Sequence, residues 1–153
     1  MRLSGPAAAA ATAGLVVALD QATKQLAATN IARGDQVAVI PGLDLTSTRN
    51  TGVAFGALAG GGVVVAVLIG ASLALLLAYF VANRDRPWLW LPVGMLLGGA
   101  LGNLADRARE GAVIDFIDPV AWPAFNLADS CIVVGVFALL YVVEGRPRRK
   151  RQA

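Results

Sequence analysis

Four long apolar stretches dominate the pattern of hydrophobic and polar residues along the chain. They cover Ala7–Ala27, Gly62–Ala82, Trp88–Ala105 and Leu127–Glu144. A helix of about 20 mostly apolar residues spans the roughly 30 Å of hydrocarbon in a bilayer. The pattern therefore predicts an all-α membrane protein with four transmembrane helices in a single domain.

The segment Thr29–Gly61, between the first two stretches, is too polar to cross a bilayer. Within it, Gln36–Ile40 and Leu43–Thr48 have the composition of strands. Pro41 and Gly42 between them are typical of a turn. We expect these residues to form a small sheet that lies on the outer, extracytoplasmic membrane surface.

Lysine and arginine residues are unevenly distributed among the flanks of the four stretches. Eight would lie on one side of the membrane: Arg2, Arg84, Arg86, Arg146, Arg148, Arg149, Lys150 and Arg151. Four would lie on the other: Arg33, Arg49, Arg107 and Arg109. Because the more positive side faces the cytoplasm, we expect both termini there. The basic tail 145–153 is expected to meet anionic lipid, not nucleic acid, and the first stretch to be a retained signal anchor.

The amino-acid composition excludes several classes of catalytic and metal site. Hydrophobic residues make up 57% of the chain and charged residues only 15%, which favours the membrane class. The absence of histidine excludes a Ser-His-Asp triad, a Cys-His dyad and His-based zinc chemistry. The single Cys131 excludes an internal disulfide and a Cys-rich metal site. We expect no metal and no cofactor.

Polar residues gather at the predicted outer ends of the helices and in the outer loops. Asp20 and Lys24 are one helical turn apart, a spacing that also suits a simple ion pair. Charges at the edge of a span are costly and usually mark a functional site. We therefore expect one site at this depth. Its other candidates are Asn50, Gly52 and Phe55 in one loop, Asn103, Asp106 and Arg107 on one helix face, and Asp115, Asn126 and Asp129.

Carboxylates are the strongest candidates for acid–base chemistry in a chain without histidine. Two carboxylates that lie close together share a proton, and the pair serves as base and acid at once. Asp115 and Asp129 are 14 residues apart, which allows a loop to bring them together. Such a pair would activate water for attack on a peptide carbonyl.

Other interpretations stay open on these residues alone. A serine–lysine hydrolase would pair Lys24 with Ser47 or Ser130, although Asp20 would keep the lysine protonated and therefore a poor base. A small four-span transporter would use the carboxylates to bind a proton or a cation, although such residues are usually near the middle of the membrane. A purely structural subunit would leave the convergence of polar residues unexplained.

Five motifs occur in order within residues 15–142. They are Asp20-Gln-x-x-Lys24, Asn50-x-Gly52-x-Ala54-Phe55, Gly98-Gly-Ala-x-Gly-Asn103-x-x-Asp106-Arg107, Val113-x-Asp115-Phe-Ile and Phe125-Asn126-x-Ala128-Asp129-Ser130. Together they resemble the motifs of lipoprotein signal peptidase, or signal peptidase II, a family of aspartic peptidases of the bacterial inner membrane. No motif position departs from the family pattern.

The resemblance implies four transmembrane helices, an outer β-cradle and a short periplasmic helix. It implies a catalytic dyad of Asp115 and Asp129 near the outer face of the membrane. The substrate would be a prolipoprotein with diacylglycerol on its lipobox cysteine, cut just before that cysteine, and globomycin would inhibit the reaction. Phe55 is a candidate gate over the substrate. Residues that would shape the site or meet the substrate are Asp20, Lys24, Asn50, Gly52, Asn103, Asp106, Arg107, Asn126 and Ala128.

Overall fold

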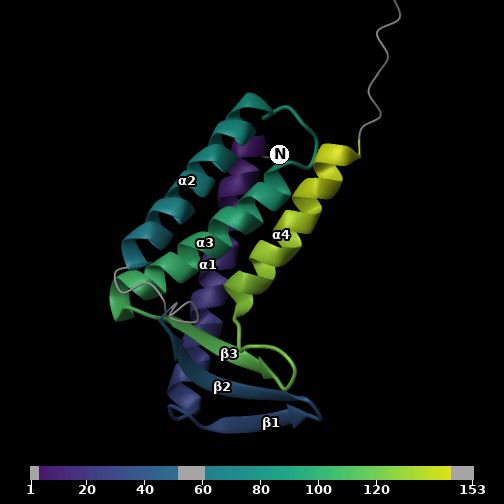
Figure 1. Ribbon diagram of the computed structural model, residues 1–153. Coiled ribbons are helices and arrows are strands. Elements are labelled where there is room, and N and C mark those ends of the chain that lie inside the picture. The colour runs from purple at the N-terminus through teal and green to yellow at the C-terminus, as the bar shows by residue number, and fades with distance from the viewer. Residues whose placement is uncertain (1–3, 52–60, 146–153) are drawn as a thin grey trace, which may run out of the picture.

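The computed structural model describes residues 4–51 and 61–145, with side chains from residue 67 onward in the second segment. These residues form four helices and three strands (Figure 1). The helices are α1 (Gly5–Asn30), α2 (Gly61–Ala82), α3 (Trp90–Glu110) and α4 (Leu127–Glu144). The strands are β1 (Gln36–Ile40), β2 (Leu43–Asn50) and β3 (Val113–Pro119).

All four apolar stretches are helical, but α3 differs from its predicted bounds. It begins at Trp90 and continues to Glu110, beyond the predicted end at Ala105. The apolar stretch stops where charged residues begin, whereas the helix continues until Gly111. That glycine has a φ of 70° and its N–H bonds to the carbonyl of Arg107, which closes the helix in the usual left-handed way.

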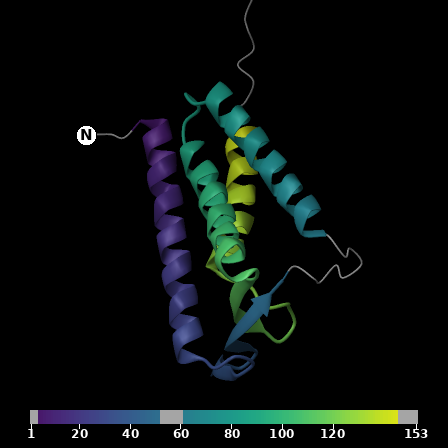
Figure 2. The same ribbon diagram turned by 90° about the vertical axis from the view of Figure 1, so that its left-hand side faces the viewer.

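Glycines of α3 allow this helix to pack closely between α1 and α4 (Figure 2). A Cβ atom on Gly98 would lie 2.8 Å from the carbonyl oxygen of Ala13 in α1. A Cβ atom on Gly99 would lie 2.6 Å from the carbonyl oxygen of Ala128 in α4. Small residues therefore bring three backbones together, as they do between helices in membranes. Helix α2 leans away from the other three (Figure 2).

The strands form one antiparallel sheet in the order β1-β2-β3. The predicted strands at Gln36–Ile40 and Leu43–Thr48 are confirmed, and the second extends to Asn50. The third strand was not predicted. It pairs with β2 so that Asp115 lies opposite Thr48. Its partner is more than 60 residues away in the sequence, so no local turn signal marks the pairing.

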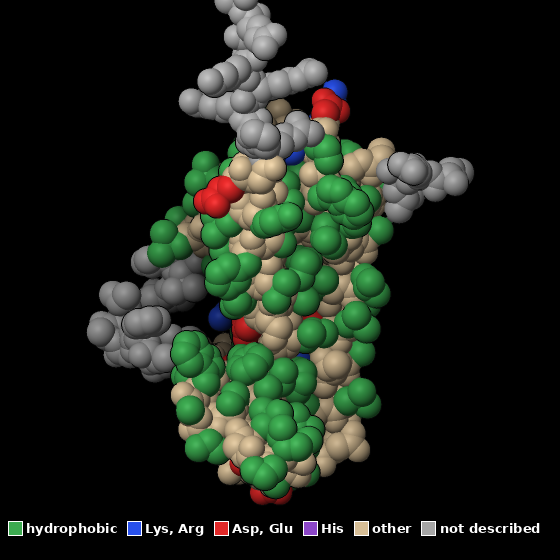
Figure 3. Space-filling view, turned by 90° about the vertical axis from the view of Figure 1, so that its right-hand side faces the viewer, with side chains coloured by type: hydrophobic (Ala, Val, Ile, Leu, Met, Phe, Trp, Pro, Cys, Tyr) green, Lys and Arg blue, Asp and Glu red, His purple; other side chains and the backbone are tan. Residues whose placement is uncertain are grey.

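The sheet closes one end of the helical bundle, and α1 begins and α4 ends at the opposite end (Figures 1 and 2). Hydrophobic side chains cover much of the helical surface, with charges at both ends and in a recess above the sheet (Figure 3). Among the described helices, α4 alone is long and apolar enough to qualify as a membrane span, and Val67–Ala82 is apolar but shorter. Four spans and an outer sheet stay predictions. The resemblance also implied a short periplasmic helix, and residues 4–51 and 61–145 contain no helix besides α1 to α4.

Candidate active site

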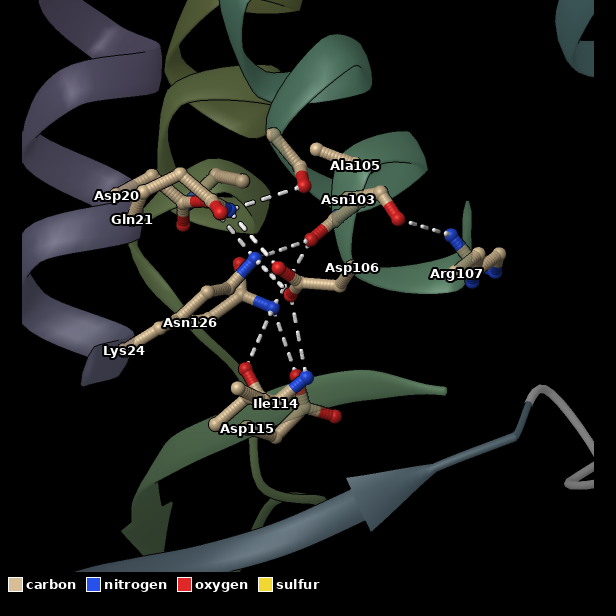
Figure 4. A network of polar contacts seen from close by, with 12 residues as sticks. Asp20, Gln21, Lys24, Asn103, Ala105, Asp106, Arg107, Ile114, Asp115 and Asn126 are labelled. Carbon is tan, nitrogen blue, oxygen red and sulfur yellow. Dashed lines mark hydrogen bonds and ion pairs between the residues drawn. The ribbon is translucent and has the colours of Figure 1, made fainter. Parts of the chain in front are cut away.

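Lys24 is the centre of a buried polar network between the helices, next to the sheet (Figure 4). Its side chain is 1% exposed, and its Nζ lies 2.8 Å from Oδ2 of Asp20 and 2.8 Å from Oδ2 of Asp106. It also donates a 2.8 Å hydrogen bond to Oδ1 of Asn103. An ammonium group has three donors, so these contacts with α1 and α3 use all of them.

The two carboxylates beside the lysine bind further elements. Oδ1 of Asp20 accepts a 2.9 Å hydrogen bond from the backbone N–H of Ala128, in the first turn of α4. Asp106 accepts from the side-chain amide of Gln21 at 2.8 Å and from the backbone N–H of Ile114 at 3.3 Å. Because buried carboxylates are stable only when paired and hydrogen-bonded, these bonds fix α1, α3, α4 and β3 relative to one another.

Asn126 connects the two aspartates of the predicted dyad. It is fully buried and donates a 2.7 Å hydrogen bond to Oδ1 of Asp115 on β3. As the N-cap of α4, it accepts from the backbone N–H of Asp129, whose carboxylate accepts in turn from the backbone N–H of Asn126. Asn103 adds a 2.8 Å bond from its amide to Oδ1 of Asp129. Asn126 therefore contacts both carboxyl groups, that of Asp115 on β3 and that of Asp129 on α4.

Asp115 is only 2% exposed, and its other carboxylate oxygen accepts a 2.9 Å hydrogen bond from the amide of Asn50. Burial raises the pKa of this carboxyl above its usual value, and the charge of Asp129 acts in the same direction. The hydrogen bonds from Asn50 and Asn126 and the charge of Lys24 oppose the rise but do not cancel it. Asp115 therefore retains its proton more readily than an ordinary aspartate.

Most of the candidates from the sequence meet in this network. Asp20, Lys24, Asn50, Asn103, Asp106, Asp115, Asn126 and Asp129 contribute side chains, and Ala128 contributes its backbone N–H. Arg107 lies apart, because it donates to the carbonyl oxygen of Asn103 on its own helix at 3.4 Å (Figure 4). Gly52 and Phe55 lie outside the described residues.

Two members of the network were missed as candidates from the sequence. The amide of Gln21 contacts Asp20, Asp106 and the carbonyl oxygen of Gly102. The feature of the sequence that could have identified Gln21 is its position inside the Asp20–Lys24 motif. Gly102 allows Asp20 to approach α3, because a Cβ atom there would lie 2.5 Å from Oδ2 of Asp20.

The network disfavours the serine–lysine alternative. All three donors of Lys24 are engaged by the two carboxylates and the amide oxygen described above. The hydroxyl of Ser130 donates to the carbonyl oxygen of Asn126 at 3.1 Å. Neither group is arranged as a nucleophile and base pair, which requires a direct hydrogen bond between them.

Residues 12–143 match the sequence family described as signal peptidase (SPase) II. The chain belongs to the signal peptidase II family. It is therefore a peptidase of the bacterial membrane, and its similarity to the family covers all of the network described above. The transporter interpretation is not supported by any of these likenesses.

Signal peptidase II relatives and solved structures agree with this membership. The lipoprotein signal peptidase of Moorella thermoacetica is 45% identical over 129 residues, 83% of this chain and 86% of that protein. The lipoprotein signal peptidase of Desulfitobacterium hafniense is 40% identical over 92% of this chain and 97% of that protein. A bacterial membrane enzyme solved by the in meso method at 1.9 Å has a TM-score of 0.81 and 35% identity, covering 88% of this chain and 91% of its own.

Gly102→Ala tests the close packing at the centre of this candidate site. The added methyl would push Asp20 away from Lys24 and from the N–H of Ala128, so we expect a loss of roughly 1–3 kcal/mol in stability. Gly14→Ala is the matched control, since a Cβ atom there would have nothing within 4 Å. Thermal unfolding in detergent measures both, and an equal effect of the two substitutions would contradict the packing argument.

Asp115→Asn is expected to raise the unfolding temperature at pH 7. Because the pKa of Asp115 is raised in the folded protein, ionising it costs about 1.4 kcal/mol of stability for each unit of the rise. Below about pH 3.9 the carboxyl is protonated in both states and the cost vanishes. The gain, a few degrees by the usual scaling, should therefore shrink as the pH falls towards 4. Unfolding temperatures between pH 4 and 8 measure it, and a gain independent of pH would contradict the cause.

Proposed function

We propose that this protein is an aspartic endopeptidase that removes signal peptides from diacylglyceryl-modified prolipoproteins and cuts just before the lipidated cysteine. One observation carries the proposal: Asp115 and Asp129 come from different elements and both contact Asn126. Relatives named lipoprotein signal peptidase, at 38–45% identity over most of the chain, support the substrate class.

In the proposed reaction one aspartate acts as the acid and the other as the base. Asp115, whose pKa is raised by burial, holds a proton and donates it to the oxygen of the scissile carbonyl. Asp129, which is partly exposed, takes a proton from water, and that water attacks the carbonyl carbon. The peptide C–N bond then breaks and the leaving nitrogen takes a proton from the pair. The pair therefore holds one proton at the start and at the end of each cycle.

The proposed location is the bacterial cytoplasmic membrane, with four spans and both termini in the cytoplasm. The start of α1 and the end of α4 lie at the same end of the bundle, while the sheet and the aspartates lie towards the other (Figure 1). The positive flanks of the sequence assign the first of these ends to the cytoplasm. The active site would then face the outer side, at the depth where a lipidated cysteine lies.

A cleavage assay with purified protein tests the function. A diacylglyceryl-modified prolipoprotein should be shortened on a gel, the same precursor without the lipid should remain intact, and globomycin should block the reaction. The lipid requirement separates this activity from that of a general signal peptidase. Failure to cut any of several lipidated precursors by a protein that unfolds cooperatively would overturn the proposal.

A further inference from the structure

An open cavity of about 360 Å³ lies at the end of the bundle opposite the aspartates. It is formed where α3 begins and α4 ends. Arg86 and Trp88 come from the connection before α3, Leu91 and Pro92 from its start, and Ala138 and Tyr141 from the last turns of α4. No residue of the proposed reaction lies in it. Its size is in the range of pockets that bind small molecules.

Arg86 brings a fixed positive charge to this cavity. Its guanidinium donates to the hydroxyl of Tyr79 at 2.9 Å and to the carbonyl oxygen of Val143. Its Nε atom is buried and has no hydrogen-bond partner among the described residues. The nearby carboxylates of Asp85 and Glu144 are exposed, and neither forms an ion pair with it. The bond to Val143 satisfies one carbonyl in the last turn of α4, and the guanidinium has no carboxylate partner among the residues that the structure describes.

Aromatic residues mark the mouth of the cavity. Trp88 is 66% exposed and Tyr141 is 79% exposed, and tryptophan and tyrosine concentrate where membrane meets water. Trp88 also has a φ of 65°, a conformation that is strained for a bulky residue and that turns the chain into α3. Arg86 is the one charged residue of the described chain that lines the cavity. Leu91, Pro92 and Ala138 contribute apolar walls to the same cavity.

We propose that this cavity binds an anionic phospholipid, with its phosphate on Arg86 and one acyl chain along Leu91, Pro92 and Ala138. One cation beside apolar walls matches the headgroup and the acyl chain of a phospholipid, and basic pockets between membrane helices are known to hold anionic headgroups. The tail 146–153 is a poor occupant, because five of its eight residues are lysine or arginine and would repel Arg86. The inference rests on the membrane setting and not on the proposed reaction.

Thermal unfolding of the full chain in detergent tests the site. We expect dioctanoyl phosphatidylglycerol to raise the unfolding temperature at a concentration at least fivefold lower than dioctanoyl phosphatidylcholine. Inorganic phosphate alone should produce no shift, since it lacks an acyl chain. Equal effects of the two lipids on the wild type would overturn the proposal, and so would an equal shift with phosphate.

Four variants locate the effect. Arg86→Gln should abolish the preference for phosphatidylglycerol, and Ala138→Trp, which fills the cavity, should abolish the shift with either lipid. Arg84→Gln, an exposed charge in the same connection, and the tail variant Arg148→Gln/Arg149→Gln should both behave as the wild type. If Arg86→Gln does not fold in lipid-free detergent, the lipid-induced shift of Ala138→Trp alone tests the site. A preference that survives Arg86→Gln or Ala138→Trp, or that is lost only in the tail variant, would overturn the site.

Discussion

Asp115→Asn and Asp129→Asn are each expected to lower the cleavage rate of a lipidated prolipoprotein roughly a thousand-fold or more. An asparagine at 115 cannot donate the proton to the carbonyl oxygen, and one at 129 cannot take a proton from water. Each role is worth on the order of a hundred- to ten-thousand-fold in rate. Single-turnover cleavage of one lipidated precursor measures the loss.

Asp118→Asn is the matched control for this prediction. It removes a carboxylate from the same strand as Asp115, but that carboxylate accepts a 2.8 Å hydrogen bond from Gln36 on β1 and lies outside the network. We expect full activity. The unfolding temperature must show that each dyad variant is folded. A folded Asp115→Asn or Asp129→Asn protein with more than about a tenth of the wild-type rate would remove that residue from the acid–base pair.

The two outcomes for Asp115→Asn are linked by one physical cause. The burial that raises the pKa of Asp115 suits it to the proposed role of acid and makes its ionised form costly in the folded protein. A substitution that removes the carboxyl should therefore lower activity and raise stability at pH 7. Stability gained by loss of a functional group is common at active sites. An aspartate that stabilises the fold in its ionised form would show the opposite change in stability.

Local sequence patterns were sufficient to predict much of the fold. The four helices follow from runs of apolar residues, and the β1–β2 hairpin follows from two strand-like runs around Pro41 and Gly42. They were not sufficient for β3, because Val113–Pro119 pairs with a strand from the other half of the chain. The end of α3 was also missed, because Asp106, Arg107, Arg109 and Glu110 make its last turns polar without ending the helix.

The site was predictable in membership and not in geometry. The motifs named most of the residues that meet around Lys24. Spacing did not show that Asn126 would contact both aspartates, since that requires the capping box of α4 beside β3. Nor did it show that Arg107 would bond to its own helix, although it follows Asp106 directly. These details depend on how α1, α3 and α4 pack, which no single stretch of sequence encodes.

Packing of these helices depends on charge balance in the network. Lys24 is the cation that contacts both Asp20 and Asp106, and the lysine and both carboxylates are at most 4% exposed. The energetic cost of removing three charges from water is met only if their mutual contacts are complete. Substitution of Lys24, Asp20 or Asp106 is therefore expected to destabilise the protein, although none of the three takes part in the proposed proton transfers.

Lys24→Met is expected to destabilise the protein by about 3–5 kcal/mol, because it leaves two buried carboxylates without their cation. For a chain of this size the unfolding temperature should fall by roughly 10 °C. Cleavage should fall as well, since Lys24 also bonds to Asn103, which in turn holds Asp129. Thermal unfolding in detergent measures the first effect, and the gel assay on lipidated precursor measures the second.

Arg109→Met is the control for this loss of a cation. Arg109 is exposed and contacts the edge of the same network through Gln21, so its removal should cost less than about 0.5 kcal/mol. Adding Asp106→Asn to Lys24→Met should recover part of the stability, because it removes one of the unpaired charges. If the double variant is instead less stable than Lys24→Met alone, hydrogen bonding by Asp106 outweighs its charge. An unchanged unfolding temperature in Lys24→Met would show that the buried ion pairs do not hold the helices together.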